Sequence, residues 1–217
     1  MSDFAARRRH MVDNQIRTAD VTKFPIINAV LAVPREFYVP TERREAAYMG
    51  ENLPLGRDRV LLEPRTFAKM LDILNIQPNE LVLDLGAGLG YSTAVLARLA
   101  ETVVAVESDE DLSREAQSNL ADQGIYNTVV VTAPLAHGAP EHGPYDAMIV
   151  EGAAEAFPQG LADQVKEGGR VACIFMEGAL GVVRLGYKID GQIAWRFSFN
   201  ASAPVLPGFH KAQEFSL

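Results

Sequence analysis

The sequence predicts an α/β protein built on a mostly parallel sheet, and three features indicate this class. From residue 80 onward, strand-like apolar runs alternate with helical segments of about 10–15 residues, as in βαβ units. The run ELVLDLG at 80–86 is almost continuously apolar, which is typical of a strand covered on both faces. The length of 217 residues suits one domain, or one domain with a small appendage, and is long enough to bury a core.

We expect residues 1–63 to form a helical segment on the substrate side and residues 64–217 to form the core, including a C-terminal hairpin. Proline and capping residues set the boundaries in the first part, because proline cannot continue a helix and aspartate favours its first cap. The predicted elements are a helix at 3–17, a second helix at roughly 21–33 capped by Asp20, an irregular segment at 34–63, and a helix that begins at Pro64.

The core elements follow from the apolar periodicity and the turn residues. Asp190-Gly191 between two strand-like runs predicts a hairpin. The expected strands and helices are, in order, strand 80–86, helix 91–100, strand 102–108, helix 109–124, strands 128–133 and 145–152, helix 157–165, strand 169–176 and the hairpin at 181–199.

Charge and composition exclude several classes of function. A formal charge of −8 gives no phosphate-neutralising attraction, and the basic run Arg7–His10 is interpreted as a solvated helix face, so we expect no nucleic-acid partner. The single cysteine, Cys173, excludes an internal disulfide and is predicted to lie in a buried strand. Neither an 18-residue apolar run nor an apolar signal core is present, so we expect a cytoplasmic protein without membrane contact.

The stretch VLDLGAGLGYS at 82–92 predicts a ligand site. Gly86, Gly88 and Gly90 are alternate residues after a strand, and glycines there let a ligand approach the backbone closely. Open parallel sheets bind ligands at the carboxyl ends of their strands. The next strand ends with Glu107, whose carboxylate can accept hydrogen bonds from both hydroxyls of a ribose. A solvated strand end is the alternative interpretation of Glu107.

The spacing of the loop favours S-adenosylmethionine over NAD. A dinucleotide fingerprint places the third glycine one position later. Here an acidic residue, Asp84, precedes the loop, and it suits the ammonium group of S-adenosylmethionine. The segment PYDAMIVEGAA fits a fourth strand of the same fold, with Glu151 at its cofactor-facing end.

At this point the chain resembles the protein-L-isoaspartate O-methyltransferases. The resemblance rests on MVDNQI (11–16), AVPREFYVP (32–40), AAYMGENLPLG (46–56), the glycine loop with its helix (82–100) and residues 144–170. It implies a Rossmann-like class I methyltransferase fold with a seven-stranded, mostly parallel sheet, flanking helices and an N-terminal helical appendage. The cofactor implied is S-adenosyl-L-methionine, and the residues expected to bind it are Asp84, Gly86, Ala87, Gly88, Gly90, Tyr91, Ser92, Glu107, Ser108, Ala133, Pro134, Leu135 and Glu151.

The sequence departs from the family pattern at the expected acceptor loop. Leu62 stands where the family carries a Ser or Thr hydroxyl beside the methyl acceptor, and Glu63 stands where an amide is usual. Ala133-Pro134-Leu135 replaces an Asp-Gly pair near the adenine, and Glu151 replaces a small or hydroxyl residue. The loss of one hydrogen bond to a charged group costs roughly 1.5–3 kcal/mol, which leaves a slow enzyme rather than an inactive one.

Two arrangements of the acceptor site stay open. Glu63 can be turned outward onto Arg59 or Arg65, and these arginines, with Arg57, can clamp an acidic acceptor; plain surface charges are the alternative. Otherwise Glu63 and Glu151 form a site for a neutral or cationic acceptor, with a carboxylate as general base.

Three functional hypotheses follow. The first is an isoaspartyl carboxyl methyltransferase acting on a damaged protein or peptide. The second is a methyltransferase of the same fold with a small-molecule or other protein acceptor, and the third is a cofactor-binding protein without methyl transfer. We expect a monomer or a weak homodimer.

Overall fold

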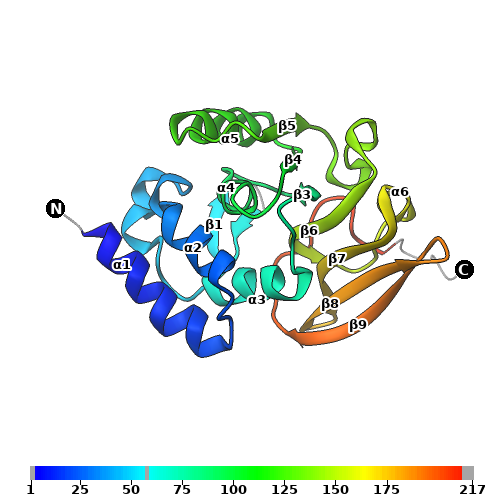
Figure 1. Ribbon diagram of the computed structural model, residues 1–217, viewed down its shortest axis with the longest axis horizontal. Coiled ribbons are helices and arrows are strands. Elements are labelled where there is room, and N and C mark those ends of the chain that lie inside the picture. Colours follow the sequence, from blue (N-terminus) through cyan, green and yellow to red (C-terminus); the bar gives the residue numbers. More distant parts are fainter. Residues whose placement is uncertain (1–2, 57–58, 212–217) are drawn as a thin grey trace, which may run out of the picture.

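The computed structural model describes residues 3–56 and 59–211 and contains the predicted seven-stranded sheet (Figure 1). The strand order is β5-β4-β3-β6-β7-β8-β9. Neighbours from β5 to β7 are parallel, and β8 runs antiparallel to both β7 and β9, which confirms the predicted fold class. The strands are β3 Leu81–Leu85, β4 Thr102–Glu107, β5 Thr128–Thr132, β6 Tyr145–Ala154, β7 Val165–Glu177, β8 Leu180–Ile189 and β9 Gln192–Asn200.

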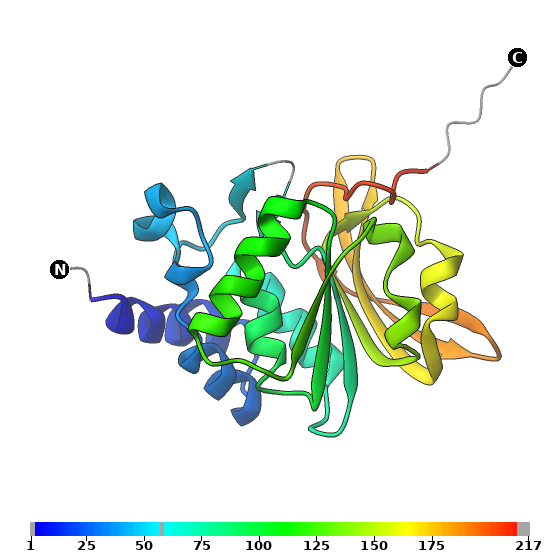
Figure 2. The ribbon, with the colours of Figure 1, turned by 90° about the horizontal axis from the view of Figure 1, so that it is seen from above.

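The central strands are apolar on both faces, so two hydrophobic cores form. Val82 and Val103 face one core, whereas their neighbours Leu83 and Val104 face the other, because successive side chains of a strand point to opposite sides. Figure 2 shows the N-terminal helices and α5 on one side of the sheet and α6 on the other. The α-helices are α1 Phe4–Met11, α2 Phe24–Ala32, α3 Pro64–Leu74, α4 Tyr91–Leu96, α5 Glu110–Asp122 and α6 Gln159–Asp163.

The N-terminal segment confirms the predicted helices but not the cap of the second. After α1 the chain stays helical through a π-helical turn at Val12–Ile16 and a 3₁₀ turn at Arg17–Ala19. Asp20 then adopts a left-handed conformation with φ of 66° and closes this helix. The prediction that Asp20 caps α2 is therefore wrong; α2 begins later because Pro25 pre-sets the backbone of its first turn.

A β-hairpin occupies part of the segment that was expected to be irregular. Strands β1 (Leu53–Gly56) and β2 (Arg59–Leu61) pair antiparallel, with Leu53 opposite Leu61. Leu53, Leu55 and Leu61 are buried, so one face of the hairpin packs onto the molecule. The hairpin leads directly into α3, whose first turn begins at Pro64 as predicted.

The N-terminal segment and the sheet share one core. Met11 and Val30 belong to the same buried cluster as Val82 and Val103. The proposed boundary at residue 63 stays a prediction. Cys173 is free and buried in β7 as expected. Within the described part of the chain, no helix is long and apolar enough to cross a membrane.

Candidate functional site

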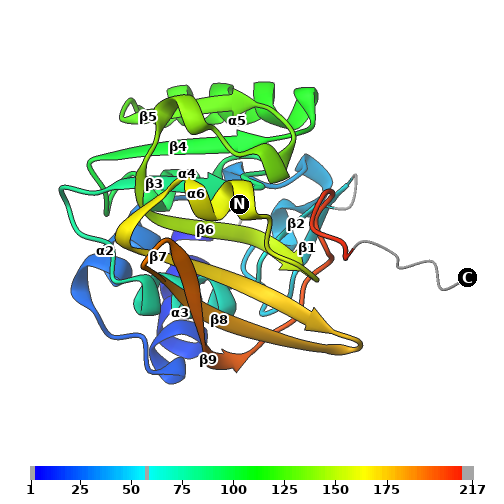
Figure 3. The same cartoon turned by 90° about the vertical axis from the view of Figure 1, so that its right-hand side faces the viewer.

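The carboxyl ends of β3, β4 and β6 bring the predicted cofactor residues to one edge of the sheet. The amide of Gly86, just after β3, donates to the carbonyl of Val106 at 2.9 Å, and the amide of Gly88 donates to Oε2 of Glu107 at 3.0 Å. Figure 3 shows the β1–β2 hairpin and the C-terminal segment, residues 201–211, at the end of the sheet where β6 ends. The predicted glycine loop, ribose carboxylate and fourth-strand carboxylate therefore lie in one region.

The glycine loop requires its glycines for conformation and for space. Gly86, Gly88 and Gly90 have φ values of 83°, 56° and 95°, a region that L-residues with a Cβ disfavour. A Cβ on Gly88 would lie 2.7 Å from Cδ1 of Leu55 in the hairpin, and one on Gly86 would lie 3.4 Å from Cδ1 of Leu206. The hairpin and the C-terminal segment thus pack directly onto the loop, which the sequence did not indicate.

Asp84 presents an unpaired oxygen beneath the loop. Its Oδ2 accepts hydrogen bonds from the hydroxyls of Ser92 and Thr93, both at 2.7 Å. Its Oδ1 is buried and has no hydrogen-bond partner among the described residues. Burial raises the pKa of Asp84 to about 6 despite the two hydroxyls, and the charge of Glu107 adds to the rise. A buried acceptor of this kind fits a cationic donor such as an ammonium group.

Glu107 is completely buried, so it is not a solvated strand end. Its Oε1 accepts from Nη2 of Arg59 at 3.0 Å and from the amides of Ser108 and Asp109 at 2.7 and 3.1 Å. Oε2 accepts from the amide of Gly88 at 3.0 Å and from Nε of Arg59 at 3.2 Å. Two carboxylate oxygens offer about four acceptor positions, so ribose hydroxyls can bind Glu107 only when the Arg59 guanidinium gives way. Sequence reasoning missed this contact because it joins residues 48 positions apart.

The residues predicted near the adenine line an open hollow of about 410 Å³. Ser108 lies at its β4 side, and Ala133, Pro134 and Leu135 follow β5. Pro207 and Gly208 of the C-terminal segment also line the hollow and were not predicted. The lining is mostly apolar, which suits the faces of an aromatic base.

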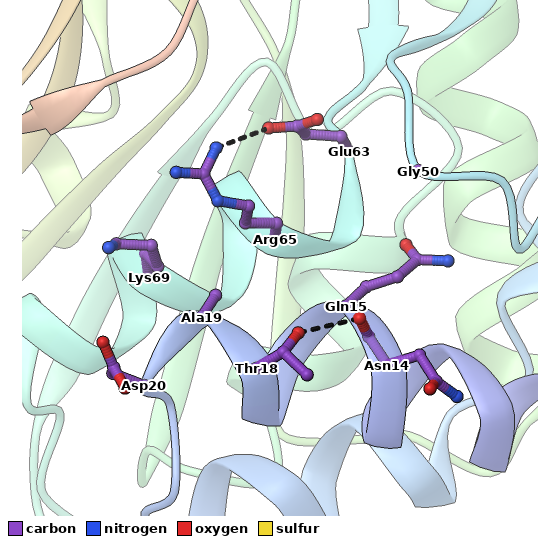
Figure 4. A pocket seen from close by; sticks show the side chains of 9 residues that line it. All are labelled: Asn14, Gln15, Thr18, Ala19, Asp20, Gly50, Glu63, Arg65 and Lys69. Atoms are coloured by element: carbon purple, nitrogen blue, oxygen red, sulfur yellow. Dashed lines mark hydrogen bonds and ion pairs between the residues drawn. The ribbon is translucent and has the colours of Figure 1, made fainter.

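The acceptor loop contains Leu62 as a fully buried apolar residue. Glu63 is turned away onto α3: its carboxylate accepts from the Thr66 hydroxyl at 2.5 Å and lies 3.9 Å from Nη1 of Arg65 (Figure 4). Of the two partners predicted for Glu63, the structure selects Arg65, while Arg59 lies on Glu107. Glu63 and Arg65 line an outer pocket of about 430 Å³ with residues of the N-terminal helices and Lys69. Arg57 lies outside the described residues.

Glu151 and Arg35 form a second pair of buried polar groups. Glu151 is only 4% exposed, and its Oε1 has no partner within residues 3–56 and 59–211. Burial and the charge of Asp84 raise the pKa of Glu151 well above its ordinary value, and Arg35 opposes this. Arg35 is fully buried; Nε donates to the carbonyl of Ala47 and Nη2 to the carbonyl of Leu62, both at 2.7 Å. Its Nη1 has no partner in the same part of the chain.

Arg35 was not singled out from the sequence, although AVPREFYVP offers a signal. It directly follows Pro34 and, with Glu36, is one of two charged residues in this otherwise mostly apolar segment. Its guanidinium carbon lies 4.8 Å from the ring centre of Tyr91, a residue of the predicted cofactor set. No group of three or more metal-ligating side chains occurs among the described residues.

Comparisons with known proteins agree on one family. The family model described as protein-L-isoaspartate(D-aspartate) O-methyltransferase matches residues 6–191. A protein-L-isoaspartate O-methyltransferase of Methanoculleus marisnigri is 33% identical over 206 residues, covering 87% of this chain and 94% of that protein. One of Vibrio cholerae is 38% identical over 151 residues, covering 70% of this chain and 73% of that protein.

Solved structures show the same fold. A protein-L-isoaspartate O-methyltransferase superposes with a TM-score of 0.82 at 24% identity, covering 93% of this chain and 66% of that one. A Plasmodium falciparum structure, described as a member of the same family in complex with S-adenosyl-L-homocysteine, gives a TM-score of 0.80 at 20% identity and covers 92% and 97%.

The sheet order and the glycine loop define the Rossmann-like fold of class I methyltransferases. Within this class, the chain belongs to the protein-L-isoaspartate (D-aspartate) O-methyltransferase family. The predictions of the family, of an S-adenosylmethionine-dependent methyltransferase and of its cofactor are thereby confirmed. The roles of individual residues stay predictions.

Proposed function

We propose that the chain transfers the methyl group of S-adenosylmethionine to the side-chain carboxyl group of an isoaspartyl residue in a damaged protein or peptide. The observation that carries this proposal is the unpaired Oδ1 of buried Asp84 directly beneath the glycine loop of a family member. The cofactor supplies an electrophilic methyl group when bound. A cytoplasmic location, a monomeric or weakly dimeric state and the absence of a nucleic-acid partner belong to the same proposal.

Asp84 binds the ammonium group of the cofactor, and Glu107 binds its ribose. Asp84 is suited to this because Ser92 and Thr93 fix one of its oxygens and leave the other free. Glu107 exchanges its partner: the ribose hydroxyls replace the Arg59 guanidinium, so β2 must shift when the cofactor enters. The released Arg59 is then available to clamp an acidic acceptor, which is one of the two arrangements that the sequence left open.

The residues of the chain position the acceptor and the methyl donor, and the reaction needs no proton transfer from them. A side-chain carboxyl group with an ordinary pKa of about 4 is already ionised at neutral pH, so it needs no base before it attacks. Buried Leu62 and the packing of Leu55 against the glycine loop exclude water from the path of the methyl group. The sequence places no hydroxyl at residue 62, and Glu63 faces Arg65 and Thr66.

One observation supports a different acceptor as a second candidate. Glu151 is a buried carboxyl group with an unpaired oxygen and a raised pKa. Such a group can act as general base for a neutral hydroxyl or amine. This alternative keeps the fold and the cofactor and changes only the substrate.

The test is transfer of a labelled methyl group to a pair of peptides that differ only in an isoaspartyl or an aspartyl residue. We expect labelled methyl ester on the isoaspartyl peptide alone. Label on neither peptide, from protein that binds the cofactor in calorimetry, contradicts the proposed acceptor and favours the second candidate.

A further inference from the structure

Two buried polar side chains, Arg35 and Glu151, lie against the acceptor loop and the glycine loop respectively. Gly86, in the glycine loop, lies against Glu151: a Cβ built on it would be 3.8 Å from Cβ of Glu151. On the other side, Arg35 donates to the carbonyl of Leu62 in the acceptor loop. Strand β2, which leads into this loop, contacts β6, which carries Glu151. Arg35 therefore contacts the acceptor loop, and Glu151 contacts the glycine loop, on two elements that pack together.

Each of the two side chains has one buried polar atom without a hydrogen-bond partner among the described residues. Nη1 of Arg35 and Oε1 of Glu151 have no hydrogen bond within the described ranges, and both side chains are more than nine-tenths buried. A buried polar atom left unpaired costs about 1–3 kcal/mol, so such atoms usually face a ligand or water. Two of them beside the acceptor loop indicate a polar ligand with oxygen atoms.

We propose that the Arg35 guanidinium and the Glu151 carboxyl group together bind the acceptor carboxylate, in place of the hydroxyl that the family resemblance expects at residue 62. This inference rests on the proposed function and names the residues that position its substrate. Arg35 supplies an N–H donor with a positive charge, which suits a carboxylate. Glu151 supplies an O–H donor when it holds its proton.

The surroundings of Glu151 favour its protonated form. Burial and, to a smaller extent, the charge of Asp84 from β3 raise the pKa of Glu151, while Arg35 lowers it. Tyr91 from α4 also faces Arg35 and Glu151. The charge of Glu107, which is paired with Arg59, raises the pKa of Asp84. An incoming acceptor carboxylate adds a second negative charge, which favours the protonated form of Glu151 further.

The chemical step balances without a proton transfer to Glu151. One oxygen of the acceptor carboxylate accepts from Arg35 and Glu151, and the other forms a bond to the methyl carbon. The carbon–sulfur bond breaks and its electron pair stays on sulfur. The negative charge of the acceptor and the positive charge of the sulfonium cancel, so the products are the methyl ester and S-adenosylhomocysteine.

The experiment compares Glu151→Ala and Glu151→Gln in the full chain. The glutamine amide keeps a hydrogen-bond donor but cannot act as a base. We expect Glu151→Ala to raise KM for an isoaspartyl peptide about 10- to 100-fold, the loss of one hydrogen bond to a charged group, and Glu151→Gln to stay close to wild type. Binding of a fluorescent isoaspartyl peptide in the presence of S-adenosylhomocysteine gives a second readout and should weaken by the same factor in Glu151→Ala.

The pH profile separates a donor from a base. Wild-type kcat/KM should fall as pH rises through the raised pKa of Glu151, because the O–H donor is lost, and Glu151→Gln should remove this fall. A matched control is Glu101→Ala, an exposed residue at the opposite end of β4, which should change neither KM nor the profile. Adding Leu62→Ser to Glu151→Ala should restore peptide affinity, which also excludes misfolding as the cause of the loss.

Failure of this inference differs from failure of the proposed function. A wild type that methylates the isoaspartyl peptide, with an unchanged KM in Glu151→Ala, overturns the inference alone. A Glu151→Gln variant as impaired as Glu151→Ala overturns it too, since a base is then required. A wild type that binds the cofactor but leaves the isoaspartyl peptide unmodified overturns the proposed function, and the inference with it.

Discussion

Replacement of Arg59 by methionine should tighten cofactor binding while it destabilises the free protein. The Arg59–Glu107 pair is almost fully buried, with side chains 2% and 0% exposed. Removal of one partner of such a pair leaves an uncompensated buried charge and costs about 3–5 kcal/mol of unfolding free energy. Bound cofactor should return part of this loss, because its ribose hydroxyls then take the place of the guanidinium on Glu107.

The magnitude follows from a thermodynamic cycle. Two hydrogen bonds from ribose hydroxyls to a charged carboxylate recover about half of the loss, or about 2 kcal/mol. The gain in cofactor binding equals the loss of stability without cofactor minus the loss with it. A difference of about 2 kcal/mol corresponds to roughly thirtyfold tighter binding. Calorimetric titration with S-adenosylhomocysteine, together with denaturant unfolding with and without it, measures all sides of the cycle.

Arg170→Met is the matched control. Arg170 forms an ion pair with Glu80 at the opposite end of β3, with Nη2 and Oε2 2.6 Å apart and side chains 17% and 12% exposed, so it is less deeply buried than the Arg59–Glu107 pair. Its loss should lower stability equally with and without cofactor and leave affinity unchanged. If Arg59→Met behaves in the same way, or binds the cofactor more weakly than wild type, Glu107 is not the ribose ligand and the proposed exchange of partners is refuted.

The remaining predictions concern the same site. Burial raises the pKa of Asp84 to about 6, so Asp84 is protonated in the free protein below that pH. Cofactor affinity, measured by calorimetry, should therefore rise roughly tenfold from about pH 5 to 7. Asp84→Asn should weaken binding and abolish this pH dependence. Leu62→Ser should increase isoaspartyl methylation by about one to two decades in a steady-state assay; an unchanged rate would show that residue 62 does not reach the acceptor. Gly88→Ala should cost about 1–2 kcal/mol of unfolding free energy through its positive φ, and should weaken cofactor binding further because its Cβ meets Leu55; normal affinity in a folded variant would contradict this geometry. Glu107→Ala should weaken cofactor binding, and unchanged affinity would argue against the ribose placement.

The local parts of the fold could be predicted from the sequence because short-range patterns determine them. The run at 80–86 and the three alternate glycines after it define strand and loop without reference to the rest of the chain. Pro64 likewise fixed the start of α3. The hairpin of β1 and β2 could not be predicted in this way, because two strands of four and three residues depend on burial against the glycine loop.

The site was harder to predict where its contacts join distant segments. Glu107 and Asp84 were identified from their place after a strand or before a loop. Two contacts could not be predicted, that of Arg59 with Glu107 and that of Arg35 near Glu151. Both form only because the N-terminal segment packs across the end of the sheet. Asp20 is the reverse case. Aspartate favours helix ends, as the sequence suggested, but Asp20 ends the preceding helix in a left-handed conformation and does not begin the next one.

The most direct test of the central claim is the location of the transferred methyl group. The wild-type protein is incubated with S-adenosylmethionine and an isoaspartyl peptide, beside the otherwise identical aspartyl peptide, and the products are fragmented by mass spectrometry. We predict a single methyl ester on the isoaspartyl residue and none on the aspartyl peptide. Methyl groups on neither peptide, or equally on both, would contradict an isoaspartyl acceptor for this site.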